Sequence, residues 1–148
     1  MLYKKIFIFL SLLFATTFLM AGHAERHQTI DGLSIYFGVI PAQLIGGHGT
    51  MHSTRGMKHG KHTYHILVAV FDDNSGKRIT DARVKATITS LNTKRETKKL
   101  EPMHGDLLSY GNFFELTETT PYIVRVEIQR TDSKTKSLAE FTFTRPRD

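Results

Sequence analysis

The sequence contains no cysteine in its 148 residues. The fold therefore holds no disulfide, and a chain of this length buries enough surface to be stable without one. The same absence excludes thiolate metal sites, iron–sulfur clusters and cysteine nucleophiles. A transition metal in this protein must take its ligands from other side chains.

Catalytic signatures are also missing. The chain has no Gly-x-Ser-x-Gly elbow, no phosphate-binding loop and no His-Glu-x-x-His pair. The segment Asp72-x-Asn74-x-Gly76 matches part of a calcium loop, but Arg83 stands where the closing glutamate should be. We interpret this segment as a hairpin turn, and we predict that the protein is not an enzyme.

Positive charge is moderate and dispersed along the sequence. The formal net charge is +6, and Lys4 and Lys5 contribute two of these charges. The other basic residues are not interleaved with aromatic side chains, so the sequence does not indicate nucleic-acid binding. A solvated basic surface accounts for the charge.

The longest apolar run lies at 6–20 and is shorter than the roughly 20 residues that span a bilayer. A basic pair precedes this run, and Gly22 and Ala24 supply the small residues of a cleavage site. We predict a signal peptide over 1–24 that is cleaved near Ala24, a periplasmic location and no stable membrane insertion. Residues 25–148 then form a single domain.

The rest of the chain consists of short stretches with period-two alternation, separated by turn signals, and no segment has a helical period. In one such stretch Val84, Ala86 and Ile88 alternate with polar side chains. The expected strands are 33–45, 63–71, 82–91, 96–100, 110–116, 122–129 and 138–144. We predict an all-β fold, a single Ig-like antiparallel β-sandwich of about seven strands.

A loop rich in glycine, histidine and methionine, at 46–62, leads into the most apolar of these strands. Its glycines leave the backbone pliable. Imidazole and thioether groups together are ligands that soft metals prefer, and they favour Cu(I) over hard cations. The candidate ligands in the loop are His48, Met51, His52, Met57, His59 and His62.

The loop also has an interpretation without a metal role. Arg55, Lys58 and Lys61 lie in it and no carboxylate does, so the local charge repels cations. Histidine-rich segments often bind metal in solution without that being their function. Among metals, the donor set favours copper, and zinc bound through histidines alone is the weaker alternative.

His65 lies inside an expected strand rather than in the loop. Because His62 and His65 are three residues apart, they can share an ion only if the strand begins after His62. The competing interpretation of His65 is a half-buried histidine that is hydrogen-bonded to a neighbouring strand.

Met103 and His104 place a thioether beside an imidazole just after a strand end. A few residues later, Gly111 permits a backbone or a ligand to approach closely. The alternative role for Met103 is to fill a gap at the end of the sandwich.

Two segments resemble known exported proteins. The run VAVFDDNSGKRITDARV, at 68–84, resembles the strand–turn–strand opening of FixH/YtkA-type domains, which implies an Ig-like sandwich. The string Leu100-Glu-Pro-Met…Tyr110-Gly-Asn…Tyr122 resembles the periplasmic copper-binding proteins that accompany bacterial iron permeases.

The second resemblance implies that Met103 is a copper ligand. The histidine that precedes Tyr-Gly in that family falls on Ser109 in this chain. One ligand is therefore missing unless His104, His65 or a loop histidine replaces it.

Two function hypotheses follow. The first is a periplasmic protein that binds a soft transition metal, copper first, for delivery, buffering or import. Its fixed ligands would be Met103, His104 and His65, and its partner a membrane metal transporter or another periplasmic protein. The alternative is an accessory protein-interaction module of a periplasmic or membrane assembly, in which the histidines are incidental.

Overall fold

A computed structural model describes residues 25–45, 60–92, 94–103 and 108–148. The elements within these ranges are β1 (His27–Ile30), β2 (Leu33–Pro41), a 3₁₀-helix η1 (Ala42–Leu44), β3 (Thr63–Asp72), β4 (Arg83–Thr89), β5 (Glu96–Pro102), β6 (Tyr110–Glu115), β7 (Tyr122–Gln129) and β8 (Lys136–Phe143). The all-β fold is confirmed, with eight strands in the described residues instead of about seven. None of the described helical residues forms a segment long and apolar enough to cross a membrane.

β1 is the strand that the sequence pattern does not reveal. It is short and polar, and it pairs with β2 through a tight turn at Asp31 and Gly32, whose φ angles are 52° and 74°. Tertiary pairing therefore places this strand, not apolar alternation. The strand expected over 33–45 ends at Pro41, which has no amide hydrogen to donate, and the chain continues as η1.

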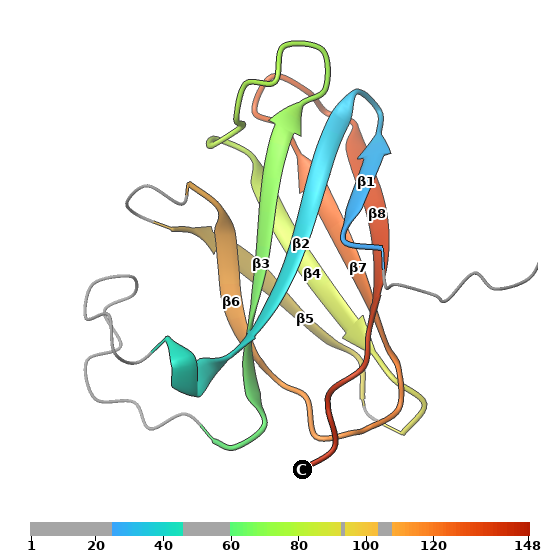
Figure 1. Cartoon of the computed structure of the whole chain (residues 1–148). Coiled ribbons are helices and arrows are strands. Elements are labelled where there is room, and N and C mark those ends of the chain that lie inside the picture. Colours follow the sequence, from blue (N-terminus) through green and yellow to red (C-terminus); the bar gives the residue numbers. More distant parts are fainter. Residues whose placement is uncertain (1–24, 46–59, 93, 104–107) are drawn as a thin grey trace, which may run out of the picture.

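All eight strands belong to one sheet in the order β1-β2-β3-β6-β5-β4-β7-β8 (Figure 1). The sheet folds over on itself into two layers, and β5 connects them. Residues 96–100 of β5 pair with β4, and its last residues, Glu101 and Pro102, pair with β6. The strand thus forms the corner of the sandwich.

Side chains continue the connection between β5 and β6 beyond this short ladder. The ammonium group of Lys98 donates a hydrogen bond to the carbonyl of Phe113 over 2.7 Å. The side-chain amide of Asn112 donates to the carbonyl of Lys99, also over 2.7 Å. Both bonds hold β6 against β5 where the two layers separate.

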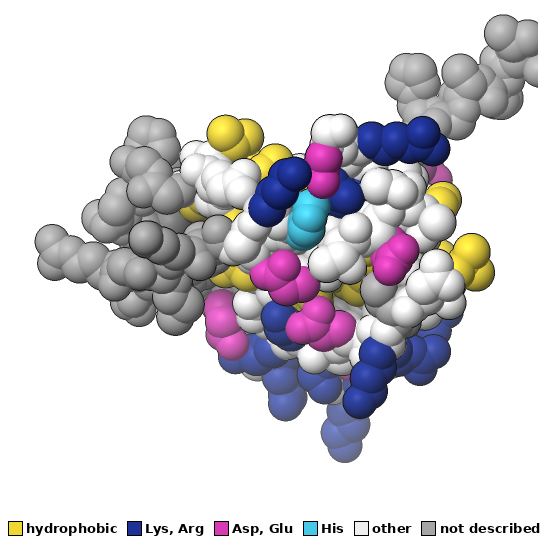
Figure 2. Space-filling model, turned by 90° about the horizontal axis from the view of Figure 1, so that it is seen from below, with side chains coloured by type: hydrophobic (Ala, Val, Ile, Leu, Met, Phe, Trp, Pro, Cys, Tyr) yellow, Lys and Arg dark blue, Asp and Glu magenta, His cyan; other side chains and the backbone are white. Residues whose placement is uncertain are grey.

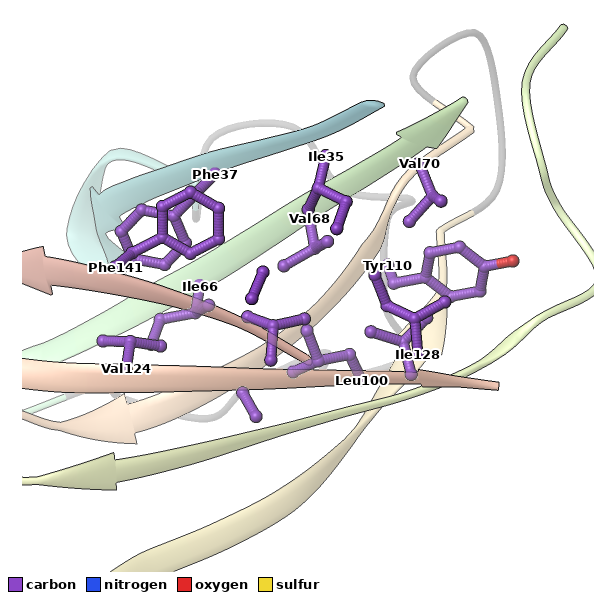
Figure 3. Packing of buried hydrophobic residues seen from close by; sticks show 14 of the residues in the cluster. Ile35, Phe37, Ile66, Val68, Val70, Leu100, Tyr110, Val124, Ile128 and Phe141 are labelled. Atoms are coloured by element: carbon purple, nitrogen blue, oxygen red, sulfur yellow. The ribbon is translucent and has the colours of Figure 1, made fainter. Parts of the chain in front are cut away.

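The core lies between the two layers (Figure 3). β4, β7 and β8 bury every second side chain, as their alternation predicts. Phe37 of β2 and Phe141 of β8 stack across the layers with ring centroids 4.8 Å apart. These contacts join strands that are distant in the sheet order.

The two end strands of the sheet, β1 and β8, meet on the side opposite β5. The side-chain amide of Gln28 donates to the carbonyl of Glu140 over 2.6 Å. The backbone amide of Glu140 in turn donates to the Gln28 side-chain oxygen over 3.2 Å. One side chain thus imitates a peptide unit and closes the sandwich.

Two buried tyrosines fix the connections between strands. The hydroxyl of Tyr110 accepts a hydrogen bond from the amide of Ala82 over 2.9 Å and donates to the carbonyl of Ile79 over 3.1 Å. Burial raises the pKa of the Tyr110 hydroxyl, since it penalises the phenolate. At the start of β7, the Tyr122 hydroxyl accepts from the amide of Glu118, a tyrosine corner typical of such sandwiches.

We predict that Tyr110→Phe lowers the free energy of unfolding by about 1–3 kcal/mol, because two buried backbone groups lose their partner. Tyr36→Phe is the matched control, since Tyr36 is half exposed, and we expect it to change stability by no more than about 0.5 kcal/mol. Equilibrium urea unfolding measures both. Equal effects of the two substitutions would contradict this role of the Tyr110 hydroxyl.

Candidate metal centre

His65 lies near the start of β3, on the face of the strand that points away from the core between the layers. Its neighbours Tyr64 and Ile66 belong to that core. His65 is nevertheless fully buried, with 0% of its surface exposed. Phe113 occupies the paired position of β6. Its ring covers the imidazole, and the two ring centroids are 4.5 Å apart.

Met103 directly follows β5, and two contacts with Ser109, just before β6, fix its position. Its backbone amide donates to the carbonyl of Ser109 over 2.7 Å. The Ser109 hydroxyl lies 3.4 Å from the Met103 sulfur and donates a weak hydrogen bond to it. The thioether is buried, with 4% exposed. The residue before Ser109, Leu108, has a φ angle of 35°, a conformation that favours glycine.

Gly111 of β6 lies between these two candidate ligands. A Cβ atom at this position would lie 2.6 Å from Nε2 of His65 and 3.1 Å from the sulfur of Met103. Both donor atoms therefore lie against Gly111, where the side chain of any other residue would stand. The close approach that the sequence predicts at Gly111 is present, and the groups that approach are an imidazole and a thioether.

The charged groups on this face are engaged elsewhere. Glu101, which is paired with Gly111, forms an ion pair of 2.9 Å with Lys99. Glu115, the next residue on this face of β6 after Phe113, accepts a hydrogen bond from the Thr63 hydroxyl. Among the described residues, the centre therefore consists of two donors, one nitrogen and one sulfur, without a carboxylate.

Such a pair suits a soft or borderline ion. Imidazole nitrogen and thioether sulfur bind copper well, and they offer little to calcium or magnesium. Ordinary bonds from transition metals to nitrogen and sulfur are about 2.0–2.3 Å long, so an ion would have to lie close to both atoms. Within the described residues there is no group of three or more His, Asp or Glu that could hold a metal. The described pair thus provides part of a coordination shell.

His62 lies at a different place. β3 begins at Thr63, so the condition for His62 and His65 to share an ion is met by the strand boundary. However, Nε2 of His62 lies 3.9 Å from the carboxylate of Asp148, which forms a 3.2 Å ion pair with Lys61. Hydrogen bonding from Lys61, followed by Arg145, lowers the pKa of the Asp148 carboxyl. His62 thus belongs to a polar cluster at the C-terminal end of the sandwich, where acidic and basic side chains lie together (Figure 2).

The other candidate ligands, His48, Met51, His52, Met57, His59 and His104, lie outside the described residues. Among the candidates that the structure describes, it brings together His65 and Met103. Sequence reasoning did not find Phe113 as the ring that covers His65. Phe113 is placed beside His65 by the register between β3 and β6. A local sequence pattern does not report that register.

The chain is similar in fold to solved structures of bacterial proteins. A DUF4426 family protein from Pseudomonas aeruginosa has a TM-score of 0.62 and 13% identity, over 81% of this chain and 96% of that one. FetP of uropathogenic Escherichia coli, expressed in the periplasm, has a TM-score of 0.61 and 14% identity, over 82% and 93%. A copper-bound variant of FetP has a TM-score of 0.59 and 15% identity, over 82% and 94%.

The sequence matches no protein-family model and no curated protein. At identities of this size the structural similarities show the fold, and the fold agrees with the resemblance to periplasmic copper-binding proteins. The resemblance to FixH/YtkA-type domains stays a prediction.

Proposed function

We propose that this protein is an exported, non-enzymatic protein that binds a soft transition metal, copper first, through His65 and Met103. The observation that carries the proposal is the convergence of His65 Nε2 and the Met103 sulfur on the space above Gly111. The fold shared with FetP, one of whose structures is copper-bound, supports it. The ion would then pass to a membrane metal transporter or another periplasmic protein.

Each residue of the centre has a separate part in this proposal. His65 supplies a nitrogen lone pair, and Met103 supplies a soft sulfur that discriminates against hard cations. Gly111 leaves the space that both donors need, and the Phe113 ring keeps water from the imidazole. The remaining ligands are assigned to His104 and to the histidines and methionines of the loop at 46–62. Zinc would be held by the histidines alone.

We expect Met103→Leu to weaken Cu(I) binding by about tenfold or more, because it removes the sulfur and keeps the volume of the side chain. His27→Ala is the control, since His27 is an exposed histidine on β1. The Cu(I) affinity of this variant should match that of the unchanged protein. Competition with a chromogenic Cu(I) chelator measures the affinities. Unchanged affinity in Met103→Leu would refute the proposed centre and favour an interaction module with incidental histidines.

Gly111→Ala should weaken metal binding and also destabilise the fold. The added Cβ would lie 2.6 Å from His65 Nε2, so the imidazole has to move, and overpacking of this kind costs about 1–3 kcal/mol. Gly38→Ala is the matched control, because its Cβ would meet Leu67 at an ordinary 3.6 Å. Thermal unfolding and the Cu(I) competition test both variants. Equal behaviour of the two variants would show that the close approach at Gly111 is not a constraint.

A further inference from the structure

The net positive charge of the chain comes mainly from one hairpin. The hairpin of β4 and β5, at 82–103, carries six basic residues, namely Arg83, Lys85, Lys94, Arg95, Lys98 and Lys99, and two acidic ones, Glu96 and Glu101. Its excess of four, with Lys4 and Lys5, accounts for the whole formal charge of +6. The rest of the chain is balanced, so this hairpin is the cationic part of the molecule.

On the outer face of this layer, the carboxylates form their ion pairs with cations outside β4. Glu101 pairs with Lys99 over 2.9 Å, Glu127 of β7 with Lys136 over 3.0 Å, and Glu140 of β8 with Arg125 over 3.0 Å. Each carboxylate on this face is therefore bound to a cation other than those of β4. In the register, Lys85 lies opposite Lys99 of β5 on one side and opposite Glu127 of β7 on the other. The Glu127 carboxylate forms its ion pair with Lys136.

Four cations of the hairpin are exposed and form no ion pair with any of the residues that the structure describes: Arg83, Lys85, Lys94 and Arg95. Arg83 and Lys85 lie on the outer face of β4, and Lys94 and Arg95 lie in the connection between β4 and β5. In the view from the C-terminal end, basic side chains gather along one border (Figure 2). Lys94 and Arg95 are adjacent in this connection, and adjacent cations of this kind attract anions.

An exposed apolar side chain lies in the same connection. Leu91 has 86% of its surface exposed, the largest value among the exposed large hydrophobic residues described. Ile123 of β7, paired with Thr89 at the end of β4, is 45% exposed. The hairpin tip thus combines Leu91 with Lys94 and Arg95, and a second apolar side chain lies beside it.

We propose that this hairpin tip docks on an anionic phospholipid surface. Lipid phosphates would neutralise Lys94 and Arg95, and Leu91 would enter the boundary between headgroups and acyl chains. An acidic protein would satisfy the cations, but the exposed Leu91 in the same connection fits a bilayer surface better. The contact is peripheral, it is independent of the metal centre, and it would hold the protein next to membrane-bound partners.

Vesicle co-sedimentation of the purified protein tests the proposal, using phosphatidylcholine vesicles with and without phosphatidylglycerol. Binding should require phosphatidylglycerol and should weaken as salt is raised. Lys94→Gln with Arg95→Gln should weaken binding about tenfold or more, because each cation near an anionic surface contributes to the attraction. Leu91→Ser alone should also weaken vesicle binding. This effect should persist at high salt, where the electrostatic attraction between the cations and the lipid is screened.

The control is Lys77→Gln with Lys134→Gln, which removes the same charge at the opposite end of the sandwich. Both lysines are exposed, and the register Arg83↔Gln129 places their end away from Leu91. Vesicle binding of this control should stay within about twofold, because its charges lie beyond the screening length. The proposal is overturned if the control weakens vesicle binding as much as Lys94→Gln with Arg95→Gln does. That result would indicate attraction by net charge alone. It is also overturned if Leu91→Ser has no effect, which would indicate a site for acidic partners in general.

Discussion

The corner at β5 is the constraint on which the rest of the structure depends. This strand pairs with β4 through Leu100 and with β6 from Glu101 onward, so one backbone belongs to both layers. The Lys98 and Asn112 hydrogen bonds keep β6 against it where the ladder is short. Because Met103 follows the corner directly, the pairing that joins the two layers also sets the position of the thioether.

The candidate centre arises from this arrangement together with the register of β3 and β6. Register places His65 opposite Phe113 and two residues from Leu67, the partner of Gly111. Because Gly111 has no side chain, the imidazole can lie over β6 and come close to the sulfur. The result is a histidine on an outward-facing position that has 0% of its surface exposed. The pair of His65 and Met103 is therefore assembled by the packing of β3, β5 and β6 rather than by a single sequence motif.

The sequence predicts most of the fold and part of the centre. Alternation in β4, β7 and β8 reports burial directly, since every second side chain faces the core. β1 has no such pattern, and its pairing depends on the turn at Asp31 and Gly32. The importance of His65, Met103 and Gly111 could be predicted individually from residue type. Their proximity could not, because it depends on cross-strand register between segments about 40 residues apart in the sequence.

The amide of Gln28 has a consequence for the behaviour of the protein in concentrated solution. An open sandwich presents two edge strands, each with unpaired backbone groups that can recruit a second chain into an extended ribbon. Gln28 occupies both the N–H and the C=O of Glu140 in the middle of β8. A single glutamine thus blocks, at its centre, the strand edge along which misassembly into intermolecular sheets would begin.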